Sequence, residues 1–368
     1  MRLFHCAGWG FVIAAVSLVV FGHPLGRLGA WDGSVAGAST NSPRSGSTAD
    51  AGEIWITAQN TDELKILLGS GDIDTVALPA GSQPHTISFT PDGSYAYVSN
   101  LGDGDVIVVR AEDRQIVATL DLAATFTHDT KASPDGSVVL SANPMSRILT
   151  KIAADEEAET WTPVASLDMG ALTGRGPVCV TFRSDGERAY VSLFGPAGGI
   201  AIVDVANMTW IGMLTTAGGV SGCGLARSKD GRTIFLNSSG GTGHFYRLDT
   251  DTDTLTEDTG FGAIGANLHG LVATANEKRA YTAAATAAEE VKVLNLQGND
   301  VSTISLDSRP GMADMPDSLV RRGSNIYVTL RFAGQVARIK TQSGAVDYIQ
   351  VAPPATTGWA VHGIAVRP

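Results

Sequence analysis

The stretch that decides the fold runs from Gln83 to Val109 and reads QPHTISFTPDGSYAYVSNLGDGDVIVV. Apolar residues alternate along three short segments of it, which is the period of half-buried β-strands. A Pro91-Asp92-Gly93 turn and a second glycine-rich turn separate the segments, because Gly tolerates the positive φ that tight hairpins need. The stretch therefore predicts three consecutive antiparallel strands.

The same pattern recurs along the chain. Related segments occupy residues 127–143, 177–193, 222–238, 268–284 and 316–330, and residues 361–368 contain only a first strand. From His85 to His362 the repeat averages about 46 residues, and a period of that size with four strands per unit is typical of a β-propeller. Seven first strands predict seven blades.

The two ends of the repeat region complement one another. Residues 53–78 supply three later strands without a first one, and the last unit supplies a first strand without the later ones. Together they complete one blade and leave no long exposed sheet edge. We therefore expect an all-β protein with residues 53–368 as one seven-bladed β-propeller, closed by the N-terminal strands.

Composition excludes other classes. The 368 residues include 43 Gly and 15 Pro, only 17% are charged, and the net charge is −11. These values do not fit a disordered chain, a coiled coil or collagen. No cluster of Lys and Arg is present, so a nucleic-acid partner is not expected.

The N-terminus resembles an export signal. An apolar run from Gly8 to Phe21 follows Arg2 and is shorter than the roughly 20 residues that a spanning helix needs. We expect residues 1–30 to be a signal peptide, with an uncleaved anchor as the alternative, and residues 31–52 to be a flexible linker. The protein should be exported to the periplasm, the cell surface or the medium. No later segment could span a membrane, and we expect a monomer.

One repeat position carries most of the candidate chemistry. Propeller blades present the start of their innermost strands to the central channel, so residues at this position converge. Four of the five histidines after the linker occupy it, and the other blades contribute Val178, Cys223 and either Met315 or Asp317. The four histidines are His85, His128, His269 and His362.

These residue types predict a metal on the propeller axis. Imidazole suits copper and iron, and a thiolate favours Cu(I). We expect the four histidines to bind copper or iron, with Cys223 as a fifth ligand and Asp129 or Asp317 orienting an imidazole. If the protein is an enzyme, it should be an oxidoreductase. The alternatives are a water-filled channel whose histidines descend from one duplicated blade, and acid–base catalysis.

Two cysteines follow the linker, Cys179 and Cys223. They could form one bridge in an oxidising compartment or remain two buried thiols. Cys179 lies one position beyond the channel-facing site, so we expect it to point away. A bridge needs Cα atoms within about 7 Å, which we do not expect between adjacent blades.

Tyr97-Val98-Ser99-Asn100, preceded by Pro84-His85 and Pro-Asp-Gly, resembles the YVTN repeat. That group includes archaeal surface-layer proteins and the haem-bearing propeller of dihaem nitrite reductase. The second resemblance implies a haem held near Thr127-His128-Asp129, with His128 and Asp129 as its ligands or contacts. The chain has no Cys-x-x-Cys-His, so full nitrite reductase activity is not expected. The first implies the main alternative function, a non-catalytic module that contacts another protein or a cell surface.

A further resemblance is to the propeller lactonases. Gln83-Pro84-His85 with Asn100-Leu101-Gly102-Asp103 is similar to one of their blades. Those enzymes also depend on an Arg-His pair, and here Gly174-Arg175-Gly176-Pro177 has no His after it. A lactonase-like hydrolase is therefore the least favoured alternative. The sequence names neither a substrate nor a protein partner.

Overall fold

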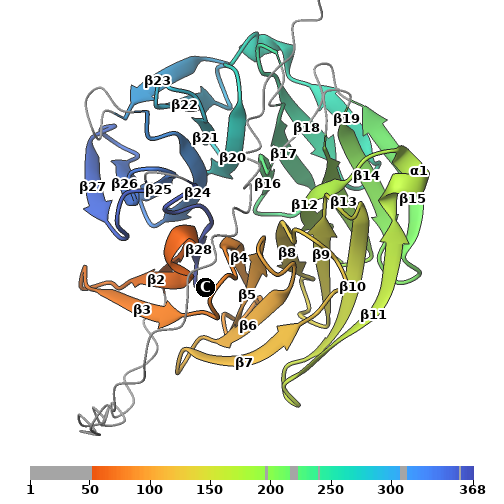
Figure 1. Ribbon diagram of the computed structural model, residues 1–368. Helices are drawn as coiled ribbons and strands as arrows, with labels where there is room; N and C mark the ends of the chain where they lie inside the picture. The colour runs from red at the N-terminus through yellow and green to blue at the C-terminus, as the bar shows by residue number, and fades with distance from the viewer. Residues whose placement is uncertain (1–51, 195–197, 216–222, 239–240, 307–312, 356–357) are drawn as a thin grey trace, which may run out of the picture. The chain divides into compact units, whose positions relative to one another are not determined.

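The computed structural model describes residues 52–368, apart from 195–197, 216–222, 239–240, 307–312 and 356–357. Within these residues, seven four-stranded antiparallel sheets surround a central axis (Figure 1). The predicted all-β, seven-bladed propeller is confirmed. The predicted signal peptide and nearly all of the linker lie outside the described residues. No helix in the described part of the chain is long and apolar enough to cross a membrane.

Each blade runs from an innermost strand beside the axis to an outermost strand at the rim. Blades one and two contain β4 (Pro84–Phe89), β5 (Tyr95–Asn100), β6 (Val106–Arg110) and β7 (Gln115–Leu120), then β8 (Asp129–Ala132), β9 (Val138–Asn143), β10 (Ile148–Asp155) and β11 (Thr160–Asp168). Blades three and four contain β12 (Pro177–Phe182), β13 (Arg188–Leu193), β14 (Gly199–Asp204) and β15 (Thr209–Thr215), then β16 (Leu225–Arg227), β17 (Thr233–Asn237), β18 (Phe245–Asp249) and β19 (Thr254–Glu257).

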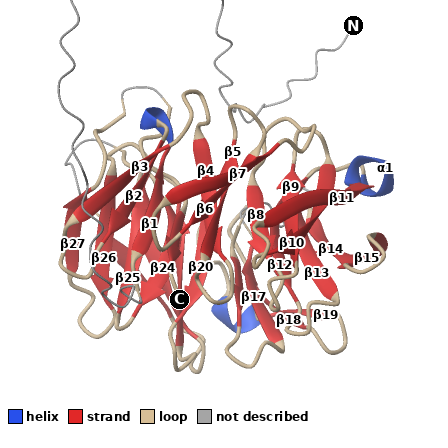
Figure 2. Cartoon of the chain, turned by 90° about the horizontal axis from the view of Figure 1, so that it is seen from below, coloured by secondary structure: helices blue, strands red, loops and turns tan. Residues whose placement is uncertain are grey.

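The remaining three blades follow the same order. Blades five and six contain β20 (Leu268–Ala273), β21 (Arg279–Ala284), β22 (Glu290–Asn295) and β23 (Val301–Ser305), then β24 (Pro316–Arg322), β25 (Asn325–Leu330), β26 (Gln335–Lys340) and β27 (Val346–Gln350). Blade seven contains β28 (Ile364–Val366), β1 (Ile54–Ala58), β2 (Glu63–Leu67) and β3 (Ile73–Ala77). In the described part of the chain, the helical elements are α1 (Met169–Thr173), at the outer edge of the ring in Figure 2, and two 3₁₀ turns at Gln59–Thr61 and Thr259–Phe261.

The core lies between neighbouring blades. Tyr97 and Val108 of blade one pack with Val139 and Trp161 of blade two in one buried cluster. The Trp161 indole N–H donates to the Tyr97 hydroxyl over 2.9 Å, which satisfies both polar groups inside the cluster. The tyrosine of the YVTN-like repeat therefore joins one blade to the next, which is why the motif identifies a fold.

The two ends of the described chain meet in blade seven. β28 pairs antiparallel with β1, with Ile54 opposite Val366 and Ile56 opposite Ile364. The sheet order β28-β1-β2-β3 confirms closure by the N-terminal strands. Without β28, the buried strand β1 would present an unpaired edge to the channel.

Local backbone geometry aims one residue of each blade at the axis. In four blades, a non-Gly residue with positive φ precedes the axial residue by two positions: Gln83, Phe126, Asn267 and Met315 stand before His85, His128, His269 and Asp317. A β-bulge also interrupts the start of four inner strands, as between Pro84 and Thr86. Bulges re-aim side chains beside active sites. Asp317, rather than Met315, therefore occupies the sixth axial position.

We predict that the closing strand carries a measurable part of the stability. Ile364 is 7% exposed and packs with Ile54 and Ile56. Ile364→Ala should lower the free energy of unfolding by about 2–5 kcal/mol, and Ile364→Val by about 0.5–1.5 kcal/mol, because the first leaves a larger cavity at the seam. Urea unfolding followed by circular dichroism measures both. Equal losses in the two variants would show that the seam is not packed as described.

Candidate metal centre on the propeller axis

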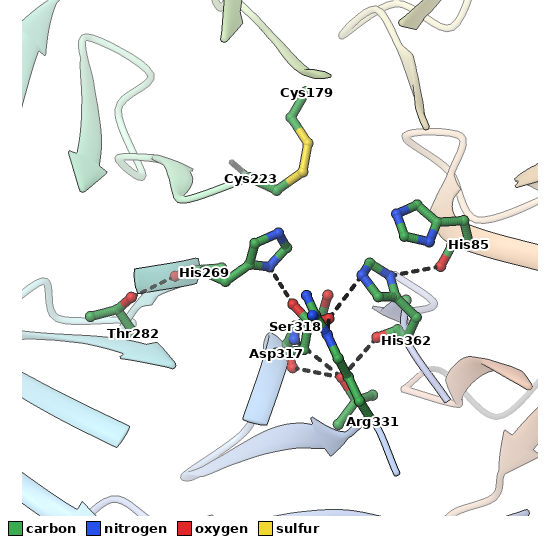
Figure 3. A network of polar contacts seen from close by, with 12 residues as sticks. His85, Cys179, Cys223, His269, Thr282, Asp317, Ser318, Arg331 and His362 are labelled. Atoms are coloured by element: carbon green, nitrogen blue, oxygen red, sulfur yellow. Dashed lines mark hydrogen bonds and ion pairs between the residues drawn. A yellow bond between two sulfur atoms is a disulfide. The ribbon is translucent and has the colours of Figure 1, made fainter. Parts of the chain in front are cut away.

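The structure brings the four predicted histidines close together at one end of the axis. The His85 and His362 rings stack with centroids 3.6 Å apart, and His128 lies edge-on to His85 at 4.4 Å. The His269 and His362 centroids are 5.9 Å apart. Residues far apart in the sequence therefore share one small volume, as Figure 3 shows for three of the four.

The candidate ligands fall into two clusters. Among the described residues, two sets of three have ligand atoms that all lie within 4.8 Å of one another. The first, called the carboxylate cluster here, contains His269, Asp317 and His362, and the second, the sulfur cluster, contains His128, Cys179 and Cys223. His85 lies between them and belongs to neither. The geometry therefore divides the ring of predicted ligands instead of placing all four histidines around one ion.

Asp317 is the centre of the carboxylate cluster and is fully buried. Its Oδ1 contacts His269 Nδ1, and its Oδ2 contacts His362 Nε2 at 2.8 Å and also the Arg331 Nε. Burial alone would raise the pKa of Asp317, but Arg331 and the two histidines hold it well below the ordinary value. The carboxylate is thus an anion shared by three nitrogen groups from three different blades or loops.

His362 faces an acceptor with each ring nitrogen. Nδ1 lies 3.1 Å from the backbone oxygen of His85, and Nε2 lies 2.8 Å from Asp317 Oδ2. A neutral imidazole carries one N–H, so either tautomer leaves a nitrogen lone pair pointing at an oxygen. Both ring nitrogens can bond at once only if the ring carries a second proton or if a metal ion lies between Nε2 and the Asp317 carboxylate. Burial lowers the pKa of His362 and so opposes the second proton, although Asp317 acts in the other direction.

The ring of His85 lacks hydrogen-bond partners. Its side chain is 1% exposed, and neither ring nitrogen has a hydrogen-bond partner. Burial first, and then the neighbouring His362 and His128, lower the pKa of His85 well below its ordinary value. A buried polar group left unpaired costs roughly 1–3 kcal/mol. Both ring nitrogens are therefore available to hydrogen-bond or ligate a molecule or ion.

His128 is partly buried on the other side of His85. Its Nδ1 lies 3.8 Å from Cys179 Sγ. Burial, followed by the positive character of His362 and His269 when protonated, lowers the pKa of His128 to about 3. At neutral pH the ring is an uncharged imidazole with a lone pair available.

The structure corrects both expectations about Cys179. It is joined to Cys223 by a disulfide, with Cα atoms 5.3 Å apart, so it does not point away and the bridge between adjacent blades exists (Figure 3). The reason is that inner strands converge toward the axis, which brings the first residues of blades three and four within bridging distance. A bridged cysteine has no thiolate, so the expectation that Cys223 is a metal ligand applies only to the reduced chain.

Asp129 forms hydrogen bonds with the neighbouring blades. Its Oδ2 accepts from the Val180 N–H at 2.9 Å, and its Oδ1 accepts from the Thr86 hydroxyl at 3.3 Å and lies 3.5 Å from Lys131 Nζ. The described residues place no imidazole against this carboxylate. Asp129 therefore connects three inner strands, whereas Asp317 takes the orienting position that the sequence had assigned to either residue.

Four residues that support the histidines and Asp317 were not predicted from the sequence. The Thr57 hydroxyl donates to the His85 carbonyl over 2.8 Å, and the Thr329 hydroxyl donates to the His362 carbonyl over 2.7 Å. Both threonines stand at the third position of YVTN-like segments, which was an available signal. Arg331 lies 4.3 Å from the Trp359 ring centre and pairs with Asp317. Neither of these two residues recurs in the repeat.

A cavity of about 290 Å³ runs along the inner strands, lined by residues from all seven blades. Its polar lining includes Asp129 and Lys131, and both bridged cysteines also border it. This cavity is the central channel, and its volume is near the lower limit for sites that bind small molecules.

The buried histidines predict a specific response to acid in the metal-free protein. Below about pH 6.5 the unfolded chain takes up protons on His85, His128 and His362 more readily than the folded chain, because the folded state lowers the pKa of all three. Stability should therefore fall as the pH is lowered from 7 to 5. For His128, whose pKa is about 3, the loss at pH 5 should reach up to about 2 kcal/mol, from roughly 1.4 kcal/mol per pH unit.

Urea unfolding at both pH values in the presence of a chelator checks this prediction. His128→Asn should show a shallower dependence on pH, because Asn does not titrate. A free energy of unfolding that is equal at pH 7 and pH 5 would contradict the described burial of the imidazoles.

Comparisons with known proteins identify the fold. No protein-family model and no curated protein matches the sequence, so membership of the YVTN group stays a prediction. Among solved structures, Kuenenia stuttgartiensis hydrazine synthase is similar with a TM-score of 0.61 and 18% identity, over 71% of this chain and 78% of that chain. Selenomethionine-substituted virginiamycin B lyase from Staphylococcus aureus is similar with a TM-score of 0.59 and 13% identity, over 78% of this chain and 89% of that chain. At these identities the similarity shows the fold alone, and the chain is a seven-bladed β-propeller.

Proposed function

We propose that this protein binds one first-row transition metal ion on the propeller axis through the carboxylate cluster. Two histidines and one carboxylate are the donor set of non-haem iron(II) sites that keep positions open for substrate. Iron fits this set best, and copper is the second candidate. With either metal, the expected activity is oxidation or reduction of a small molecule.

The observation that carries the proposal is the contact between His362 Nε2 and Asp317 Oδ2. The two atoms are 2.8 Å apart, and neighbouring ligands at about 2.1 Å from an octahedral ion lie roughly 3 Å apart. His362 Nδ1 can then donate its proton to the His85 carbonyl, which lies 3.1 Å away. Metal-binding histidines commonly make this second contact, because it fixes the tautomer.

The surroundings favour a small, polar substrate. The unpartnered ring of His85 and the uncharged ring of His128 border the carboxylate cluster and can accept or donate hydrogen bonds to a bound molecule. Arg331 supplies a positive charge beside Asp317. The channel is bordered by Gly270, Ser318 and Gly363, each of which directly follows one residue of the carboxylate cluster. Its volume of about 290 Å³ suits a small molecule better than a haem, and Asp129 is already engaged between blades.

The second candidate is acid–base catalysis without a metal. The same His362 geometry is satisfied if that ring carries two protons, with Asp317 as its counter-ion. In that case His362 would be a general acid and the protein would not be an oxidoreductase. The non-catalytic surface module remains the alternative if neither a metal nor a substrate binds.

The proposal extends to location and family. We infer an exported YVTN-type propeller, supported by the apolar run from Gly8 to Phe21 and by the repeated Tyr-Val-Ser/Thr segments. Fractionation of the native host would test the location, and a protein found only in the cytoplasm would contradict it.

Metal content of the full chain, purified without a histidine tag, tests the site. We expect about one equivalent of iron or copper after incubation with either metal and removal of the excess. Loss of a residue that only hydrogen-bonds to a metal ligand weakens metal affinity by roughly 10–100-fold. Asp317→Asn and His269→Ala remove proposed ligands themselves, so each should weaken metal affinity by more than that.

A matched control removes a histidine elsewhere. His244 pairs with Glu257 on blade four and is not one of the ligands of the carboxylate cluster. His244→Ala should keep the full equivalent of metal. A protein that stays metal-free with iron, copper and zinc, or that loses metal equally in all three variants, would overturn the proposal.

A further inference from the structure

We infer that the sulfur cluster is a second metal site that becomes available when the Cys179–Cys223 disulfide is reduced. Its ligands would be two thiolates and the His128 imidazole, a set suited to a cation that prefers sulfur, such as Zn²⁺. None of these residues belongs to the carboxylate cluster. The second site therefore goes beyond the proposed function and does not depend on it.

The distances fit a tetrahedral ion. Zinc binds sulfur at about 2.3 Å and nitrogen at about 2.0–2.1 Å, which places a sulfur and a nitrogen ligand roughly 3.6 Å apart. Cys179 Sγ and His128 Nδ1 are 3.8 Å apart. The two cysteine Cα atoms are 5.3 Å apart, so both sulfurs can reach one ion by rotation about their side-chain bonds.

The backbone on both sides is already held in place. The Cys179 N–H donates to the Ser192 hydroxyl over 3.0 Å, and the Leu225 N–H donates to the Cys223 carbonyl over 2.8 Å. These contacts do not involve the sulfurs, so opening the bridge leaves the two residues facing each other. The site is thus arranged by the blades before any ion arrives.

The site also has an entry path and a free position. Both cysteines line the axial cavity of about 290 Å³, through which a small reductant and an ion can approach. Three protein ligands leave the fourth corner of a tetrahedral zinc to water, as in catalytic zinc sites. Zinc held only for structure normally has four protein ligands.

The chemistry balances with a dithiol as reductant. The dithiol gives two electrons and two protons to the protein disulfide, whose sulfur–sulfur bond breaks to form two thiols, and the dithiol becomes a disulfide itself. Zn²⁺ then replaces the two thiol protons, which pass to water, and accepts the lone pair of His128 Nδ1. A small-molecule disulfide can reverse this change: it takes two electrons from the two thiolates and two protons from water to become two thiols, while the protein bridge forms again and Zn²⁺ is released. The bridge and the bound ion are therefore mutually exclusive states of one site.

The test compares the oxidised and reduced forms of the full, untagged chain under anaerobic conditions. After reduction by a dithiol and its removal, the protein should bind one more equivalent of Zn²⁺ than the oxidised protein, measured by competition with a chromophoric chelator. Co²⁺ should give thiolate charge-transfer absorption in the reduced protein only. Circular dichroism should show that the sheets persist on reduction.

Two variants separate this site from the carboxylate cluster. Cys223→Ser should lose the additional equivalent and most of the Co²⁺ charge-transfer band while keeping the axial equivalent. Asp317→Asn should lose the axial equivalent and keep the additional one, so failure of one proposal is distinguishable from failure of the other. His128→Ala should weaken the additional Zn²⁺ at least tenfold.

Several outcomes would overturn the inference. Equal Zn²⁺ binding by oxidised and reduced wild-type protein would do so without any variant. An additional equivalent retained in Cys223→Ser, or a loss of sheet structure on reduction, would also show that these three residues do not form the site.

Discussion

The pairing of β28 with β1 is the constraint on which the rest of the structure depends. It closes the ring, and it also builds the site, because His362 lies just before β28 and Thr57 lies on β1. The His362 N–H donates to the Thr57 carbonyl over 3.1 Å, and the Gly363 N–H donates to the Thr57 hydroxyl over 2.7 Å. The same hydroxyl contacts the His85 carbonyl. The seam of the propeller is thus the support of its candidate metal centre.

The closed, repetitive ring also explains which features of the structure could be predicted from the sequence. The period, the strand pattern and the incomplete units at the two ends were enough to predict seven blades, because each depends only on spacing and turn chemistry. The gathering of the four histidines followed from the same symmetry. What the spacing could not show was which side chains contact one another within the ring. The division into a carboxylate cluster and a sulfur cluster depends on bulges and positive-φ residues whose effects become visible only in three dimensions.

Three particular features mark that limit. Arg331 and Trp359 have no counterparts in the repeat, so no argument from periodicity could place them beside Asp317. The Cys179–Cys223 bridge was judged from the typical separation of neighbouring blades, whereas inner strands are much closer at the axis than strands at the rim. Asp317 was an open choice against Met315, and the left-handed backbone at Met315 decided it. Burying the Asp317 and Arg331 charges in a channel costs desolvation energy that pairing only partly offsets, which agrees with a role in binding more than in stability.

The position of His362 has a consequence for biogenesis. Six blades of the propeller precede this residue in the chain, and its partners Asp317, His85 and Thr57 all lie upstream of it. Domains generally fold from the N-terminus as they are synthesised. A nascent chain that lacks His362 therefore cannot assemble the carboxylate cluster, however well its other blades have folded. Assembly of the carboxylate cluster is therefore coupled to closure of the ring, because it cannot precede synthesis of the inner strand of blade seven.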